Sequence, residues 1–90
     1  MKKITVKEVE EVTGEGLEAL GGESVMLFCM NYIYAGTLSG INDSFVQLTD
    51  AKIVFESGPF SQPGYKDAQK LPGDVWYVQR GAIESFGRGK

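Results

Sequence analysis

The sequence predicts a mainly β domain, a five-stranded bent barrel preceded by a short N-terminal helix. From residue 24 onward, apolar runs rich in β-branched and aromatic residues alternate with short turn signals, which is the pattern of consecutive strands. Glycines lie inside or beside the second run, where the strand of a small barrel has to bend sharply. Ninety residues are enough for one small domain, so residues 1–90 are predicted to form a single unit.

Residues 1–21 form the predicted N-terminal helical segment. Thr5 and Glu8 fit a capping box, and the valines of residues 4–12 repeat at helical spacing before Gly14, a typical helix stop. Because β-branched residues are mediocre helix formers, a strand remains the alternative for this segment.

The first two strands are predicted from residues 25–30 and 33–39. The run 25–30 is apolar on both faces, as expected for a strand inside a barrel and under a helix. Asn31-Tyr32 then turns the chain into the second strand. Gly36 and Gly40 predict strong bending there.

A long third strand is predicted over residues 45–56, after a turn at Asn42-Asp43, with at least one irregularity along its length. Residues 57–73 contain all three prolines of the chain together with several glycines. This composition predicts a long loop between the third and fourth strands.

The last two strands are predicted over residues 75–79 and 82–86, joined by a tight turn at Arg80-Gly81. Residues 87–90 are expected to be a frayed tail. One short helix followed by five such strands describes an SH3-type barrel.

The composition argues against an enzyme and against a metal centre. The chain has no His and one Cys, which excludes His-based acid–base catalysis and an internal disulfide, and which makes a zinc site a poor fit. No nucleophile has a visible base, and no Gly-Lys-Ser/Thr phosphate loop occurs. We therefore expect no catalytic residues, no metal and no cofactor.

The charge is unevenly distributed along the chain. The net charge is −3, and residues 1–23 alone hold three Lys and six Glu, which is 3 − 6 = −3. The remaining residues are neutral overall, so a bound nucleic acid would have to be gripped locally rather than steered from a distance.

No apolar run approaches the roughly 20 residues that span a bilayer. The basic start Met1-Lys2-Lys3 is not followed by an apolar segment of the signal-peptide type. The expectation is a soluble, cytoplasmic protein without a membrane partner.

Four fragments in order resemble the two motifs of the Sm-like (Sm/LSm) RNA-binding family, which includes bacterial Hfq. They are Gly22-x-x-Val25-x-Leu27-x-Cys29, Gly36-x-Leu38-x-Gly40, Asp43-x-Phe45-Val46-Gln47-Leu48 and Arg80-Gly81-Ala82-Ile83. The resemblance covers roughly residues 16–56 and 74–87 and would suit a divergent bacterial or phage member. Gln47 stands where the family typically has Asn, and the acidic residue or Asn that commonly follows Arg-Gly is missing.

The resemblance implies an RNA site at two turns. Phe45 would stack on a base, with core packing as its alternative role. Arg80 would cover the other face of the base, or else form a surface ion pair. Gln47 would read the base edge or satisfy backbone groups, and Asp43 would accept backbone N–H bonds that fix the turn. Gly81 would supply a positive φ.

The resemblance also implies a ring, because the family's fourth strand pairs with the fifth strand of the next subunit. Residues 75–79 would meet residues 82–86 of a neighbour and close a homo-oligomer of about five to seven copies. Trp76 and Tyr77 point to opposite faces of their strand, so one of them is left near an edge. The expected interface residues are Val75, Trp76, Tyr77, Val78, Ile83 and Phe86.

The leading hypothesis is a non-enzymatic ring that binds short, single-stranded, U-rich RNA near its pore. The alternative is a structural or adaptor ring that binds protein, for which Phe60, Tyr65 and Leu71 in the long loop are candidate contacts. A third possibility is a monomeric SH3-like module for proline-rich peptides.

Overall fold

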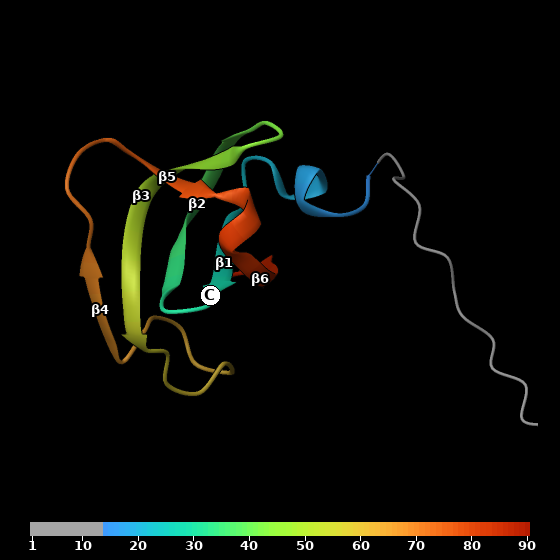
Figure 1. Cartoon of the computed structure of the whole chain (residues 1–90). Coiled ribbons are helices and arrows are strands. Elements are labelled where there is room, and N and C mark those ends of the chain that lie inside the picture. The colour runs from blue at the N-terminus through green and yellow to red at the C-terminus, as the bar shows by residue number, and fades with distance from the viewer. Residues whose placement is uncertain (1–13) are drawn as a thin grey trace, which may run out of the picture.

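A computed structural model describes residues 14–90, and the helix expected over residues 4–12 lies outside the described part. The fold is mainly β, with six antiparallel strands in one sheet and two short 3-10 helices (Figure 1). The elements are η1 Leu17–Leu20, β1 Ser24–Cys29, β2 Ile33–Ile41, β3 Phe45–Glu56, β4 Asp67–Lys70, β5 Val75–Gln79, η2 Arg80–Ala82 and β6 Ile83–Arg88.

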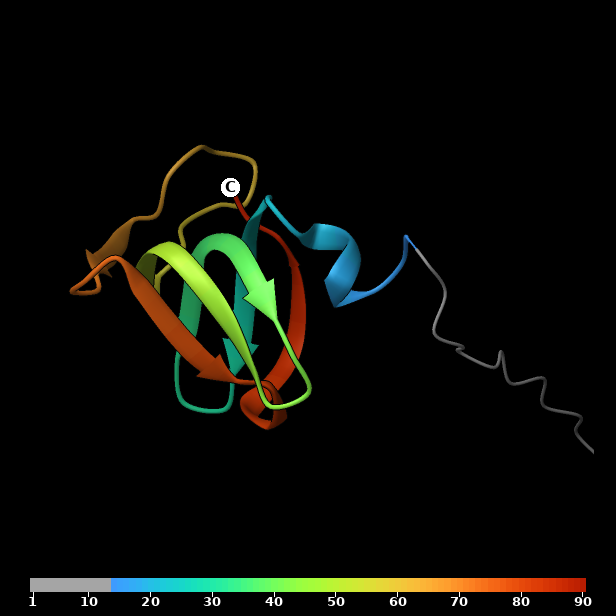
Figure 2. The ribbon, with the colours of Figure 1, turned by 90° about the horizontal axis from the view of Figure 1, so that it is seen from above.

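The strand order is β4-β3-β2-β1-β6, and β5 pairs with β3 as well. Figure 2 shows β5 and β6 diverging from η2 to opposite sides of a curled sheet. No pairing between β5 and β6 occurs within residues 14–90, so the sheet is open rather than closed into a barrel. The β class is confirmed, but the prediction of five strands is wrong because β4 is a sixth.

β3 is long enough to hold two different neighbours along one edge. Its first part, Phe45–Thr49, pairs with β5, and its second part, from Lys52 on, pairs with β4. Between them Asp50 has φ 51°, a conformation in which a non-glycine residue is uncommon. This is the irregularity that the sequence predicts for the third strand.

Gly36 lets β2 follow β3 past this irregularity. The register between β2 and β3 shifts at Gly36, and a Cβ added there would lie only 3.0 Å from the Thr49 carbonyl oxygen. Glycine is therefore required for the close approach of the two backbones, as the predicted bend in the second strand implies.

Apolar side chains fill both faces of the sheet. The larger cluster comprises Leu17, Val25, Leu27, Leu38, Val46, Leu48, Ala51 and Val78. On the opposite face Met26, Ala35 and Val54 form a second cluster, which Tyr65 and Ala68 cover from the segment after β3. The strand β1 is thus apolar on both faces, as predicted, but side chains of the segment after β3 and of β4, rather than a helix, cover the second face within the described residues.

Two other loop predictions are wrong. Residues 57–73 are not loop throughout, because Asp67–Lys70 pair with β3 as β4. The tail is not frayed either. β6 continues to Arg88, opposite Val25, and the Gly89 amide donates to the Ser24 carbonyl at 2.8 Å. Backbone pairing with β1 therefore extends over most of the predicted tail.

The connection between the last two strands also differs from the prediction. Residues Arg80–Ala82 form the 3-10 helix η2 instead of a tight turn. Since β5 pairs with β3 while β6 pairs with β1, the two strands do not form a hairpin.

No helix within residues 14–90 has the length and apolar character needed to cross a membrane.

Candidate functional site

The β2–β3 turn and the start of η2 lie together although they are far apart in the sequence. Phe45 pairs with Gln79 in the β3–β5 ladder, and the Arg80 amide donates to the Ser44 carbonyl at 2.8 Å. The ladder continues directly into this contact, so backbone pairing itself positions the two segments. The structure therefore brings the predicted site residues Phe45, Gln47 and Arg80 to one end of the sheet.

Phe45 lies on the surface and not in either core cluster. Its side chain is 37 % exposed, and its ring meets the ring of Tyr77 edge-on, with centroids 5.0 Å apart and an interplanar angle of 81°. Because β3 side chains alternate, Val46 and Leu48 are buried while Phe45 and Gln47 point outward. An outward aromatic face is what base stacking requires.

Gln47 is held by two neighbouring hydroxyl groups. Its Nε2 donates to the Tyr77 hydroxyl at 2.9 Å, and its Oε1 accepts from the Ser39 hydroxyl at 3.1 Å. An amide has two donors and two acceptor sites, so one of each remains for a ligand. The two contacts fix the orientation of the amide and of the Tyr77 ring beside Phe45.

The Arg80 guanidinium already has partners. Its Nη1 donates to the Asn42 carbonyl at 3.1 Å, and its Nη2 lies 2.9 Å from the Glu18 carboxylate. A hydrogen bond with its own backbone, and then Arg80, lower the pKa of Glu18, which keeps this carboxyl ionised. The surface ion pair that the sequence left open as the alternative is therefore present.

Asp43 and Gly81 do not act as predicted. The turn is fixed by Asn42, whose Oδ1 accepts from the amides of Ser44 and Phe45, both at 2.8 Å. Asp43 is exposed beside it. Gly81 lies within η2, and its φ is not positive. The sequence signal for the turn was present in Asn42, which favours such turns as strongly as Asp does.

The predicted interface residues divide into three groups by exposure. Val75, Tyr77 and Phe86 are exposed, whereas Trp76 and Ile83 are half-buried against the larger core cluster. Val78 is only 4 % exposed, so its side chain is a core group and not a surface contact. Within residues 14–90 the outer edges of β5 and β6 pair with no other strand.

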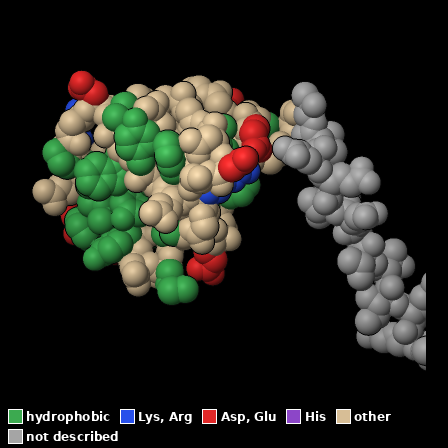
Figure 3. Space-filling model, turned by 45° about the horizontal axis from the view of Figure 1, so that its top comes forward, with side chains coloured by type: hydrophobic (Ala, Val, Ile, Leu, Met, Phe, Trp, Pro, Cys, Tyr) green, Lys and Arg blue, Asp and Glu red, His purple; other side chains and the backbone are tan. Residues whose placement is uncertain are grey.

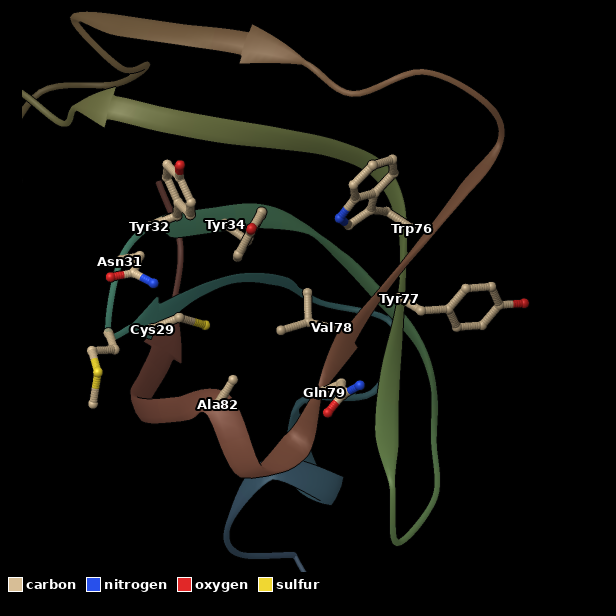
Figure 4. A pocket seen from close by; sticks show the side chains of 10 residues that line it. Cys29, Asn31, Tyr32, Tyr34, Trp76, Tyr77, Val78, Gln79 and Ala82 are labelled. Carbon is tan, nitrogen blue, oxygen red and sulfur yellow. The ribbon is translucent and has the colours of Figure 1, made fainter.

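A hollow of about 260 Å³ opens between β5 and the turn from β1 to β2 (Figure 4). Cys29, Tyr34, Trp76 and Val78 point toward it, and its lining contains no charged side chain. Burial raises the pKa of the Cys29 thiol, so this thiol is a poor nucleophile at neutral pH. The hollow could not be predicted from the sequence, because its walls come from strands that are far apart in the chain.

Figure 3 shows hydrophobic side chains gathered on the face that carries β5, with few Lys or Arg side chains among them. Within the described part of the chain, no group of three His, Cys, Asp or Glu residues is placed to hold a metal ion. The site is therefore an aromatic surface with one ion-paired arginine at its end.

No family model, curated protein or solved structure matches this chain. The functional assignment consequently depends on the geometry of the site itself.

Proposed function

We propose that the protein is a non-enzymatic, cytoplasmic, Sm-like protein that forms a homo-oligomeric ring and binds short, single-stranded, U-rich RNA. The observation that carries the proposal is the outward-facing ring of Phe45 at the point where the β2–β3 turn is bonded to Arg80. A flat aromatic surface and a guanidinium plane are the two groups that hold an unstacked base, and here the guanidinium of Arg80 is engaged by Asn42 and Glu18.

The recognition of a base would use groups that are already oriented. Tyr77 supports the Phe45 ring from its edge, and Gln47 keeps one donor and one acceptor free. Stacking on a preformed aromatic surface costs little side-chain entropy, which favours binding.

Arg80 would join this site only by weakening its contact with Glu18. The pair is at the surface, where such an ion pair contributes little to stability, so a nucleic-acid phosphate or base can compete for the guanidinium. The affinity of one site for one base is then low. Several copies of the site around a ring raise the overall affinity for an RNA strand.

The ring itself is supported by the strand edges. β5 and β6 are the strands that the Sm-like resemblance pairs between neighbours, and each leaves its outer edge without a strand partner in the described chain. An exposed edge strand is a template for pairing with another copy. Light scattering at micromolar concentration should give a closed oligomer, and a monomer would contradict the ring.

The RNA proposal is tested by fluorescence titration with labelled oligo-U, oligo-A and mixed RNA. Phe45→Ala should weaken oligo-U binding at least about fivefold, because stacking of one base is worth about 1–3 kcal/mol. Arg80→Lys keeps the charge but removes the guanidinium plane, so it should also weaken binding. Phe55→Ala is the matched control, since Phe55 is an exposed phenylalanine at the other end of β3. Equal affinity of all variants would contradict the proposed site.

The second candidate is an adaptor ring that binds protein. The ion pair of Arg80 and the uncharged lining of the hollow favour it, because both lower the attraction for RNA. Of its three candidate loop contacts, Tyr65 and Leu71 pack against the core clusters, and Phe60 is 68 % exposed. Loss of partner capture by Phe60→Ala with RNA binding unchanged would favour the adaptor function.

A further inference from the structure

The ammonium group of Lys90 lies in a cage made by the segment that follows β3. Its Nζ donates to the carbonyl oxygens of Ser57 at 2.5 Å and Pro59 at 2.8 Å. The same Nζ lies 5.6 Å from the ring centroid of Phe60 and 5.4 Å from that of Tyr65. Figure 2 shows the C-terminal end of the chain beside this segment.

This combination of groups recognises a cation by chemistry other than an ion pair. An ammonium is attracted to aromatic faces within about 6 Å, and its three N–H groups require acceptors. Among the described residues, no carboxylate forms a salt bridge with Lys90. Carbonyl oxygens and two rings therefore replace the carboxylate that a surface lysine ordinarily meets.

Both carbonyl groups of the cage also accept hydrogen bonds from within their own segment. The Ser57 carbonyl also accepts the Lys66 amide at 3.4 Å, and the Pro59 carbonyl also accepts the Gln62 amide at 3.1 Å. Each carbonyl oxygen has two lone pairs, so one is used within the segment and the other is left for the cation.

The walls of the cage are held in the same way. Gly58 has φ 70°, a left-handed conformation that glycine favours, and it lies between the two residues whose carbonyl groups accept from Lys90. Tyr65 packs against the cluster of Met26, Ala35 and Val54, which holds one aromatic wall against the sheet. Beside Lys90 a hollow of about 210 Å³ remains open, and its lining includes Tyr65 and Lys66.

We propose that residues 57–66 form a preformed binding site for a primary alkylammonium group, and that Lys90 fills this site within its own chain. When Lys90 lacks its ammonium, the site accepts an alkylammonium group from another molecule. The bound Lys90 also joins the end of β6 to the segment after β3, at opposite sides of the open sheet. Vacating the site therefore removes the link between the Lys90 side chain and this segment.

The experiment uses the full chain with Lys90→Met, which keeps the length and apolar character of the side chain but removes the ammonium. The probe is n-butylammonium chloride, and n-butanol is the neutral probe of equal size. We expect saturable NMR shifts of the Gly58 and Gly64 amides with n-butylammonium only. In the wild type the same shifts require at least about tenfold more probe, because the site is vacant in few molecules.

Two further variants make the test specific. Phe60→Ala added to Lys90→Met should abolish the shifts. Lys66→Met is the matched control, since Lys66 lines the same hollow but its Nζ pairs with Glu56, so this variant should behave like the wild type. A folded Lys90→Met protein that shows no saturable shift, or that responds equally to n-butanol, overturns the proposal.

A measurement on the wild type covers the case in which Lys90→Met does not fold. The ammonium protons of Lys90 should exchange with water more slowly than those of Lys66, because two carbonyl oxygens accept them. Equal exchange of the two ammonium groups overturns the proposal.

Discussion

The guanidinium of Arg80 lies 2.9 Å from the carboxylate of Glu18, although 62 residues separate them in the sequence. Arg80 thus joins η1 to the turn that carries Phe45, since its other nitrogen donates to the Asn42 carbonyl. The same ion pair neutralises the one guanidinium that the proposed RNA site requires. Two opposed consequences of this pair can be measured, one on binding and one on stability.

Glu18→Gln should strengthen oligo-U binding about two- to fivefold, the range expected when one exposed charge pair is removed. The substitution keeps the size of the side chain and frees the guanidinium for the ligand. Fluorescence titration measures the effect. Glu56→Gln is the control, because it removes the same charge from the other end of β3, where Glu56 pairs with Lys66. An equal gain in oligo-U affinity in Glu18→Gln and Glu56→Gln would mean that the net charge of the protein, and not the Glu18–Arg80 pair, controls binding.

The stabilising effect of Glu18 should disappear in acid. A hydrogen bond with its own backbone, and then Arg80, lower the folded-state pKa of Glu18 below its ordinary value of 4.5. A carboxyl with a lowered pKa contributes stability that is fully present above the ordinary value and is lost as the pH falls through the folded value. Thermal unfolding should show the wild type melting above Glu18→Gln at neutral pH, with the gap closing below pH 4.5. A gap that stays constant into acid would rule out this linkage.

Asn42→Ala should destabilise the protein by about 1 kcal/mol, because two backbone amides lose a shared acceptor. The adjacent Asp43→Ala should change the free energy of unfolding by less than about 0.5 kcal/mol, as is usual for an exposed position. Urea denaturation compares the two variants directly. A larger loss of stability in Asp43→Ala than in Asn42→Ala would mean that Asp43 fixes the turn, as the sequence predicted.

The strands were predictable where hydrophobic and polar side chains alternate over a long run. The bounds of β3 and β5 agree with the residues predicted, and β3 alternates between the buried Val46 and Leu48 and the outward Phe45 and Gln47. β4 escaped because its sequence, Asp67 to Lys70, is short and polar and lies among prolines and glycines. Its strand conformation comes from pairing with β3. This pairing leaves no hydrophobic pattern in the residues of β4 themselves.

The proximity of the two segments of the candidate site was predictable, but their side-chain contacts were not. The turn residues and Arg80 do meet, because the β3–β5 ladder leads directly to them. The partners of Arg80 and Lys90 were not predictable, since Glu18 and the Ser57 carbonyl lie far away in the sequence. Such contacts depend on the curl of the whole sheet and not on any motif.

Gly36→Ala should destabilise the protein by about 1–3 kcal/mol, the usual cost of adding a methyl group where there is no space. The new Cβ would lie 3.0 Å from the Thr49 carbonyl oxygen and 3.2 Å from the Ala51 Cα, and both are backbone atoms that cannot rotate away. Gly81→Ala is the matched control, because a Cβ there meets nothing within 4 Å and the backbone φ is not positive. Alanine at position 81 should be neutral or stabilising, since it lowers the entropy of the unfolded chain. Urea denaturation of both variants decides the matter: a large loss at position 81 would show that this glycine is needed after all, and no loss at position 36 would contradict the close approach of β2 and β3.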